Sequence, residues 1–109
     1  MNAHRRRDYR HFPDSYPALL YRFDRDAHAT LGPMPQRDAR AVVRDLYRYK
    51  TFLSHALDTD PADDAARDLH RIAARLMIRV EPVATENGTD THVIVLQVNP
   101  VTAAMEATP

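Results

Sequence analysis

One short segment of the sequence combines side chains that could bind a metal. Asp24, Asp26 and His28 fall within five consecutive residues and offer oxygen and nitrogen ligands, the donors that divalent metals use in hydrolytic sites. Three ligands so close together would leave the coordination shell incomplete, and Asp and His also occur in loops because of ordinary turn chemistry. We therefore expect no metal here, and a small metal-dependent hydrolase is the third hypothesis for function.

A row of arginines is the second group with binding chemistry. Its members recur at three- and four-residue steps, so a helix of 3.6 residues per turn would present them on one side. They are Arg37, Arg40, Arg44 and Arg48. His55 extends the row, whereas Asp38 and Asp45 fall toward its flank. Guanidinium groups recognise carboxylates and phosphates, so the row predicts contact with an acidic protein surface or a nucleic acid, unless it is simply a solvated helix face.

The sequence lacks the motifs of the common enzyme classes. With only Gly32 and Gly88 it cannot form a glycine-rich phosphate loop. Without cysteine it has no thiolate nucleophile, disulfide or thiolate metal site. Its two serines, Ser15 and Ser54, lie outside any Gly-x-Ser-x-Gly motif. We therefore expect a protein that is not an enzyme and that uses no cofactor.

Charge is distributed unevenly along the neutral chain. Residues 1–55 hold ten Arg and one Lys against six Asp, a balance of +5. Residues 56–109 hold four Arg against six Asp and three Glu, a balance of −5. Such a split favours an acidic partner for the basic half, or pairing between copies. The lack of cysteine and of any long apolar run favours a cytoplasmic protein with no membrane contact, and the excess of Arg over Lys suggests a GC-rich bacterial genome.

The apolar pattern predicts the elements that carry these groups, beginning with a strand. Leu19, Tyr21 and Phe23 recur at every second position of 17–23, which is typical of a strand with one buried face. The following segment, 24–35, contains one glycine and two prolines, so we expect a loop there.

Two helices are expected next. Residues 36–57 carry apolar side chains at three- and four-residue steps, and Pro35 is suited to the start of that helix. The second helix is expected to begin at Pro61, with Asp60 as its N-cap. Its outer face alternates acidic and basic side chains that can pair at a spacing of three residues. These side chains belong to Asp64, Arg67, Asp68, Arg71 and Arg75.

A β-hairpin completes the pattern. Alternating apolar residues at 78–83 and 93–98 flank Asn87-Gly88, a dipeptide that tolerates the positive φ angles of a type I′ turn. A two-residue turn there would place Val80 opposite Val95. The expected core consists of Leu46, Leu53, Leu69, Ile72, Leu76, Val80 and Val95.

These elements predict an α+β fold of order β-α-α-β-β, with two helices packed on one face of a three-stranded, mainly antiparallel sheet. We expect a flexible basic arm at 1–15, a single domain at 16–100 and a flexible tail at 101–109. The main alternative is a winged helix with its wing tip at 86–90. Its groove-entering helix would begin with three acidic residues, which DNA phosphates would repel.

The first hypothesis for function is a small non-catalytic bacterial protein that acts through protein–protein contact or self-association, with the arginine row as its binding surface. The alternative is a nucleic-acid-binding accessory or regulatory protein that adds the basic segment at 5–7 to the same row. The isoelectric point of about 7.0 is well below that of a dedicated nucleic-acid-binding domain, so a protein partner ranks first. The sequence leaves the identity of that partner open.

Overall fold

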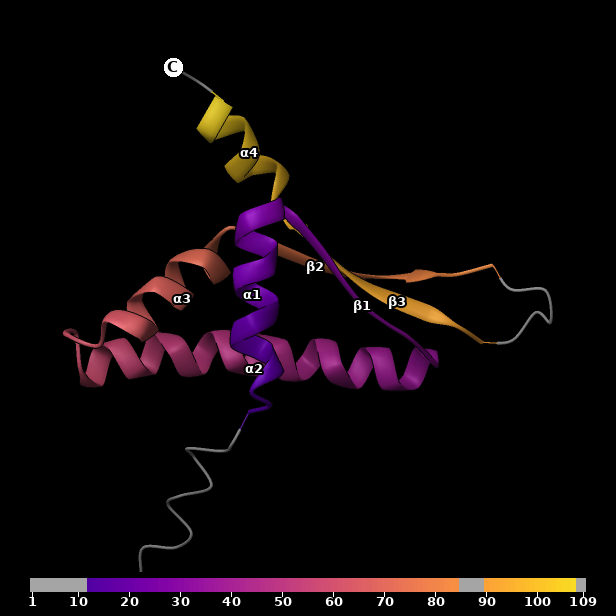
Figure 1. Ribbon diagram of the computed structural model, residues 1–109, viewed down its shortest axis with the longest axis horizontal. Coiled ribbons are helices and arrows are strands. Elements are labelled where there is room, and N and C mark those ends of the chain that lie inside the picture. Colours follow the sequence, from indigo (N-terminus) through magenta and orange to yellow (C-terminus); the bar gives the residue numbers. More distant parts are fainter. Residues whose placement is uncertain (1–11, 85–89, 108–109) are drawn as a thin grey trace, which may run out of the picture.

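The protein is an α+β domain, with four helices and three strands in the residues that the structure describes. The computed structural model describes residues 12–84 and 90–107, and Figure 1 shows the arrangement of the elements. The helices are α1 (Ser15–Asp26), α2 (Gln36–Thr59), α3 (Asp64–Ala74) and α4 (Pro100–Ala107). The strands are β1 (His28–Met34), β2 (Leu76–Pro82) and β3 (His92–Val98). The expected α+β class and three-stranded antiparallel sheet are confirmed, but the order of elements is α-β-α-α-β-β-α instead of β-α-α-β-β.

The strand predicted at 17–23 is wrong, because this segment forms helix α1. Its buried side chains are Tyr16, Leu19, Leu20 and Phe23, which lie three, one and three positions apart and therefore on one side of a helix. Tyr21, which the strand would have buried, is 43% exposed. The helix ends at Ala27, whose left-handed backbone (φ 59°) turns the chain into β1.

The loop predicted at 24–35 is also wrong, because it contains the C-terminal end of α1 and all of β1. Of the residues that favoured a loop, Gly32 and Pro33 lie at one irregular point of the strand, and Pro35 follows the strand as the N-cap of α2. Gly32 has a φ of 115°, the peptide bond to Pro33 is cis, and the register with β3 shifts between Leu31 and Met34. A side chain at Gly32 would stand 3.2 Å from the carbonyl oxygen of His92. Pairing with a distant strand thus outweighs the local preference for a turn.

Helix α2 is confirmed, and α3 begins later than expected. The N-cap of α3 is Asp63, whose side chain accepts a hydrogen bond of 3.0 Å from the backbone N–H of Ala66. Asp60, the predicted cap, instead accepts from the N–H of Ala62 at 3.1 Å and follows the last residue of α2. Both aspartates are able to cap a helix, so the sequence alone could not decide between them.

The sheet has the order β1-β3-β2, with β3 in the centre and antiparallel to both neighbours. The hairpin of β2 and β3 is confirmed, but Val80 pairs with Ile94 and not with Val95. This register leaves an odd number of residues between paired positions, whereas a two-residue Asn-Gly turn requires an even number. The expected turn and the wing tip of the winged-helix alternative fall mostly on 85–89, which lies outside the described residues.

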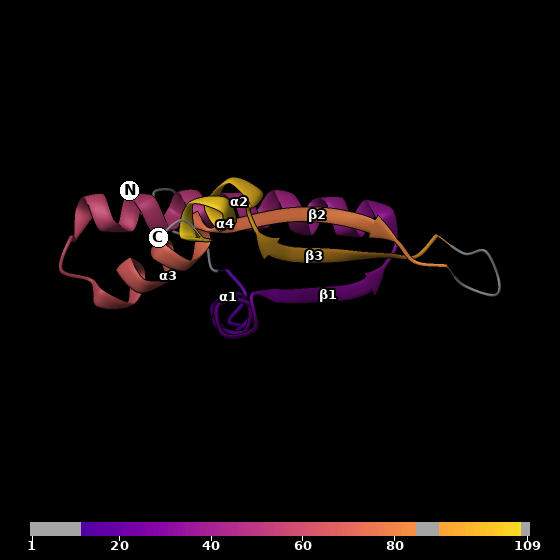
Figure 2. The same cartoon turned by 90° about the horizontal axis from the view of Figure 1, so that it is seen from above.

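The two faces of the sheet have different surroundings. One face packs against α1, α2 and α3 in a single hydrophobic core, to which the sheet contributes Ala29, Leu76, Ile78, Ile94 and Leu96. Because side chains alternate along a strand, the register places the intervening residues on the other face, called the open face below. Its residues are His28, Thr30, Met77, Arg79, Glu81, Val93, Val95 and Gln97. Figure 2 looks onto this face, and no helix of the described chain lies over its middle.

Most of the predicted core is confirmed. Five of its residues are buried and belong to the core cluster: Leu46, Leu53, Leu69, Ile72 and Leu76. Val80 is only partly buried and packs against that cluster. Val95 is 3% exposed but lies on the open face between Thr30 and Arg79, because the register differs by one residue from the predicted one.

Two helices lie at or beyond the predicted boundaries of the domain. Most of the arm expected at 1–15 lies outside the described residues, and α1 already begins at Ser15. The segment expected to be a tail, 101–109, contains most of α4. In the described part of the chain, no helix has the length and hydrophobicity needed to cross a membrane.

Candidate interaction surface

Helix α2 is the platform of the candidate surface. It has 24 residues, so it is about 36 Å long at 1.5 Å per residue. One side is fixed in the core by Ala39, Leu46, Tyr49 and Leu53. The predicted arginines lie on the opposite side, because successive residues of an α-helix are turned by about 100°. The core therefore holds the arginine backbone in place while leaving the side chains toward solvent.

The structure brings all four predicted arginines onto one exposed stripe, which we call the arginine face. It consists of Arg37, Arg40, Arg44 and Arg48, each of them exposed. Their Cα positions span about 16 Å along the helix axis. No ion pair or hydrogen bond joins any of their side chains to another residue of the described ranges 12–84 and 90–107.

Asp45, which lies on the flank of the arginine face, is engaged elsewhere. Its Oδ2 accepts a hydrogen bond of 2.9 Å from the hydroxyl of Tyr16 on α1. Burial of the ring, together with the hydrogen bond and the negative charge of Asp45, raises the pKa of Tyr16 to about 12. This carboxylate therefore ties α1 to α2, although it is close enough in sequence to pair with Arg44 or Arg48. The carboxylate of Asp45, beside the arginine face, is thus engaged by the partly buried hydroxyl of Tyr16.

The arginines of α3 contrast with those of α2, because each has a carboxylate partner. Arg67 pairs with Asp64 at 3.0 Å and Arg71 pairs with Asp68 at 2.8 Å, as the three-residue spacing predicted. Arg75, at the end of α3, donates to both carboxylate oxygens of Glu106 at 2.8 and 2.9 Å.

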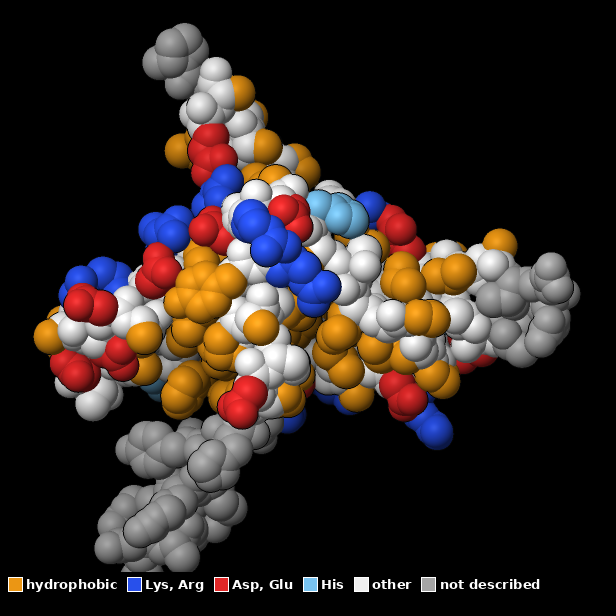
Figure 3. All heavy atoms as spheres, viewed as in Figure 1, with side chains coloured by type: hydrophobic (Ala, Val, Ile, Leu, Met, Phe, Trp, Pro, Cys, Tyr) orange, Lys and Arg blue, Asp and Glu red, His pale blue; other side chains and the backbone are white. Residues whose placement is uncertain are grey.

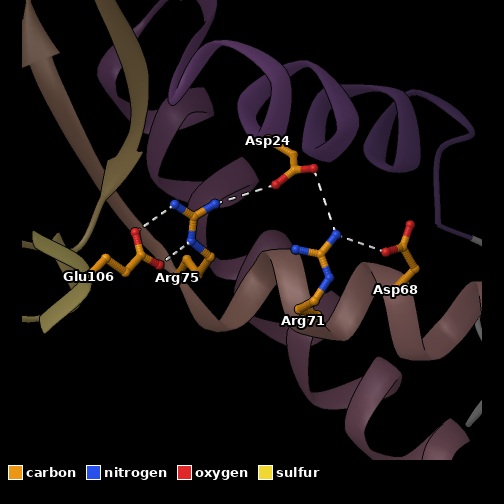
Figure 4. Close-up of polar contacts among 5 residues, drawn as sticks. All are labelled: Asp24, Asp68, Arg71, Arg75 and Glu106. Atoms are coloured by element: carbon orange, nitrogen blue, oxygen red, sulfur yellow. Dashed lines mark hydrogen bonds and ion pairs between the residues drawn. The ribbon is translucent and has the colours of Figure 1, made fainter. Parts of the chain in front are cut away.

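Asp24 of α1 connects two of these ion pairs. Its carboxylate lies 3.7 Å from Arg71 and 3.4 Å from Arg75, so a continuous network joins α1, α3 and α4 (Figure 4). The arginines at 67, 71 and 75 are therefore held in ion pairs, whereas the four on α2 have no such partner within 12–84 and 90–107.

Tyr47 is an aromatic side chain beside the arginine face that the sequence analysis did not single out. It is 47% exposed and lies between Arg44 and Arg48 in the chain. The Nζ of Lys50 stands 5.6 Å from the centre of its ring, and partial burial lowers the pKa of Lys50. Tyrosine and arginine are both enriched at protein–protein contacts. The signal that could have identified Tyr47 is its position one residue outside the apolar stripe of the helix.

The three candidate metal ligands are not arranged as a chelate. Asp24 belongs to the arginine network of Figure 4, and Asp26 pairs with Arg25 at 3.0 Å. The hydrogen bond from Arg25 lowers the pKa of Asp26. His28 begins β1 on the open face, on the other side of the turn at Ala27. Within 12–84 and 90–107, no three His, Asp or Glu side chains form a group that could hold a metal.

A second histidine, His92, lies beside Asp90, a carboxylate that contacts the first residue of α2. Its Nδ1 lies 3.0 Å from one carboxylate oxygen of Asp90. The other oxygen of Asp90 accepts a hydrogen bond of 3.2 Å from the backbone N–H of Gln36. A carboxylate at this end also complements the positive pole of the helix dipole. Asp90 therefore joins the start of α2 to the residues just before β3, which is a structural role.

The acidic residues at the start of α3 still argue against DNA binding in the manner of a winged helix. The order of elements from α1 to β3 is compatible with that architecture, in which α3 would enter the major groove. However, the first residues of α3 and the turn before it include Asp60, Asp63 and Asp64, and the side chain of Asp64 is 90% exposed. These carboxylates would face DNA phosphates, and the arginines behind them are already paired.

No model of a known protein family matches this sequence, and no curated protein or solved structure is significantly similar to it. Function is therefore inferred from the surface of the domain itself.

Proposed function

We propose that this protein is a non-catalytic binding protein, cytoplasmic and bacterial, that docks onto an acidic surface of a protein partner through the arginine face of α2. The observation that carries the proposal is the presence of four exposed guanidinium groups on one rigid helix with no carboxylate partner among the described residues. A stripe that served only solubility would gain from local ion pairs such as those on α3.

The chemistry of the side chains favours this use. An arginine can bind a carboxylate through two parallel hydrogen bonds, which gives geometric specificity as well as attraction. The backbone of α2 is fixed by the core, so binding would immobilise only the side chains. A row of like charges also accelerates encounter with an oppositely charged surface. Tyr47 would add apolar contact area at the edge of the same surface.

A nucleic acid is the alternative partner, and the domain as a whole disfavours it. The chain has no net charge, and its second half carries an excess of acidic residues. The exposed carboxylates around the start of α3 would repel the phosphates of a strand that extended along α2 to that end of the helix. A nucleic-acid complex would show affinity that falls steeply with salt.

The test compares the unmodified protein with a triple variant, Arg37→Glu, Arg44→Glu and Arg48→Glu. The fold should survive, because these residues are exposed on the side of α2 opposite its buried residues and their replacement opens no cavity. The matched control reverses three exposed arginines elsewhere, with Arg22→Glu, Arg25→Glu and Arg67→Glu. Circular dichroism and thermal melting establish that both variants are folded.

Fluorescence anisotropy then measures binding to a labelled polyglutamate peptide and to labelled duplex DNA across a salt series. We expect the peptide to bind the unmodified protein and the control, and to lose binding in the triple variant. Micromolar or tighter binding to DNA near about 150 mM salt, lost in the triple variant, would replace the proposed protein partner with a nucleic acid. Equal peptide binding by the triple variant and the control would show that the arginine face has no special role.

A further inference from the structure

Two arginines at the end of α3 show how this domain binds a carboxylate that comes from a neighbouring helix. Arg71 and Arg75 are four positions apart, so they lie one turn apart on the same side of their helix. The carboxylate of Asp24 on α1 stands between them, with one oxygen 3.7 Å from Arg71 and the other 3.4 Å from Arg75 (Figure 4). One carboxylate therefore bridges two arginines of successive turns across a helix–helix contact.

The arginine face repeats this spacing twice in succession. Arg40, Arg44 and Arg48 follow one another at intervals of four residues. Arg37 lies three residues before the first of them, and all four fall within an arc of about 80° around α2. Figure 3 shows acidic and basic side chains side by side over α3 and α4, whereas the arginine face has no carboxylate partner within 12–84 and 90–107. The described chain thus holds the same arginine spacing once with a bridging carboxylate and twice without one.

We infer that the acidic surface bound by the arginine face is an α-helix of the partner protein, whose carboxylates bridge successive arginines as Asp24 bridges Arg71 and Arg75. It rests on the proposed function, because it specifies which kind of acidic surface the face binds. The two helices lie side by side, and each partner carboxylate is placed between two guanidinium groups. The row offers three such positions, one between each pair of neighbouring arginines. Opposite charges attract the two surfaces, and the paired hydrogen bonds of the guanidinium groups fix their register.

The spacing of the three bridging positions favours a helix over a strand. Along the axis of α2 the midpoints between neighbouring arginines lie about 2, about 7.5 and about 13.5 Å from Arg37, a span of about 11 Å. Carboxylates at positions i, i+4 and i+7 of a partner helix span about 10.5 Å and match this value within about 1 Å. Three carboxylates on one side of a strand span about 13 Å, which misplaces one of them by about 2 Å. Arginine–carboxylate hydrogen bonds are short and directional, so the strand would bind with poorer geometry.

Tyr47 defines how the partner helix is oriented around its own axis. Tyr47 and Ala41 flank Arg44 at about 60° on either side, and both are exposed. The tyrosine ring offers a large apolar surface with a polar tip, whereas the alanine offers only a methyl group. An apolar residue beside the acidic row of the partner helix therefore packs on the Tyr47 flank.

Two helical, alanine-based peptides of identical composition test the inference. The first carries glutamates at i, i+4 and i+7, the second carries the same glutamates distributed around the helix, and circular dichroism establishes equal helicity. We expect fluorescence anisotropy near about 150 mM salt to show about ten-fold tighter binding of the first peptide, lost in the triple arginine variant. Equal affinities would overturn the inference and leave the proposed function standing, because charge alone would then decide binding. Binding of polyglutamate without binding of the first peptide would also overturn it, whereas failure of all three to bind would refute the proposed function itself.

Arg44 provides a second test, because it belongs to two bridging positions whereas Arg37, at the end of the row, belongs to one. Arg44→Gln should therefore weaken binding of the first peptide about ten-fold, against about three-fold for Arg37→Gln. Toward polyglutamate the two variants should lose affinity equally, since each removes one charge. Arg44→Lys keeps the charge but lacks the planar fork of the guanidinium group, so it should weaken binding of the helical peptide and not of polyglutamate. Equal losses at the two positions toward the helical peptide would contradict the bridged arrangement.

Discussion

The hydrogen bond from Tyr16 to Asp45 makes the packing of α1 on α2 testable through pH. Tyr16 is 5% exposed, and its pKa is raised from 10.0 to about 12 by burial and by the nearby carboxylate. Folding therefore favours the neutral hydroxyl. Its contribution to stability is fully present below about pH 10 and is lost as the pH rises toward about 12. A shift of about two units corresponds to about 2–3 kcal/mol of unfolding free energy.

The variant Tyr16→Phe keeps the ring in the core and removes the hydroxyl. At neutral pH it should cost about 1.5–3 kcal/mol, because a hydrogen bond to a charged acceptor is lost. Urea unfolding from pH 7 to pH 11.5 measures the difference between the unmodified protein and the variant at each pH. We expect this difference to shrink above about pH 10, since Tyr16 of the unfolded chain then ionises while the folded hydroxyl stays neutral, and the variant has no hydroxyl to ionise.

The exposed Tyr47 provides the control, because Tyr47→Phe removes a hydroxyl that lies outside the core. That variant should change the unfolding free energy by less than about 0.5 kcal/mol at neutral pH. A Tyr16→Phe difference that stayed constant up to pH 11.5 would refute the reasoning, because the Tyr16 hydroxyl would then be neither buried nor beside a carboxylate. The assignment of 15–26 to a helix packed on α2 would be in doubt with it.

Three further predictions concern the core, α4 and metals. Leu69→Ala should cost about 2–5 kcal/mol of unfolding free energy, because it leaves a cavity, and a loss below about 0.5 kcal/mol would contradict its place in the core. Glu106→Gln should speed amide exchange in α4 without lowering the melting temperature of the domain. Arg75 lowers the pKa of Glu106, so acidification through that lowered pKa should also speed amide exchange in α4 of the unmodified protein. Zinc, manganese and magnesium should leave the melting temperature unchanged, and a saturable increase abolished by Asp26→Ala would contradict this.

The longest helix and the hairpin were predicted well from the sequence, because the spacing of their apolar residues fits only one of the two periods, that of a helix or that of a strand. The segment of α1 is ambiguous in principle. Leu19 and Phe23 are four positions apart, which satisfies both the two-residue period of a strand and the repeat of a helix. Only Leu20 and Tyr21 separate the two readings, since the helix buries the former and exposes the latter. Two residues were too few to decide.

Strand β1 could not be predicted locally, because its structure depends on pairing with β3 more than fifty positions away. The arginine face also combines a feature that the local sequence predicts with one that depends on distant contacts. Its residues were predictable from their spacing on a strongly amphipathic helix. Their lack of a carboxylate partner in the described part of the chain was not predictable, because the partners of Asp45 and Arg75 lie 29 and 31 positions away in the sequence. Which charges are satisfied is decided by tertiary contacts.

The central position of β3 has a consequence for the way the chain folds. Both other strands precede it in the sequence, and neither has a neighbour in the sheet until β3 has been made. The hairpin of β2 and β3 closes a short loop, whereas β1 must wait while α2 and α3 are completed, at a larger entropic cost. A nascent chain interrupted before residue 92 would carry two unpaired strands with free edges. Such edges pair readily with other chains, so ribosomal pausing ahead of β3 would expose this protein to aggregation.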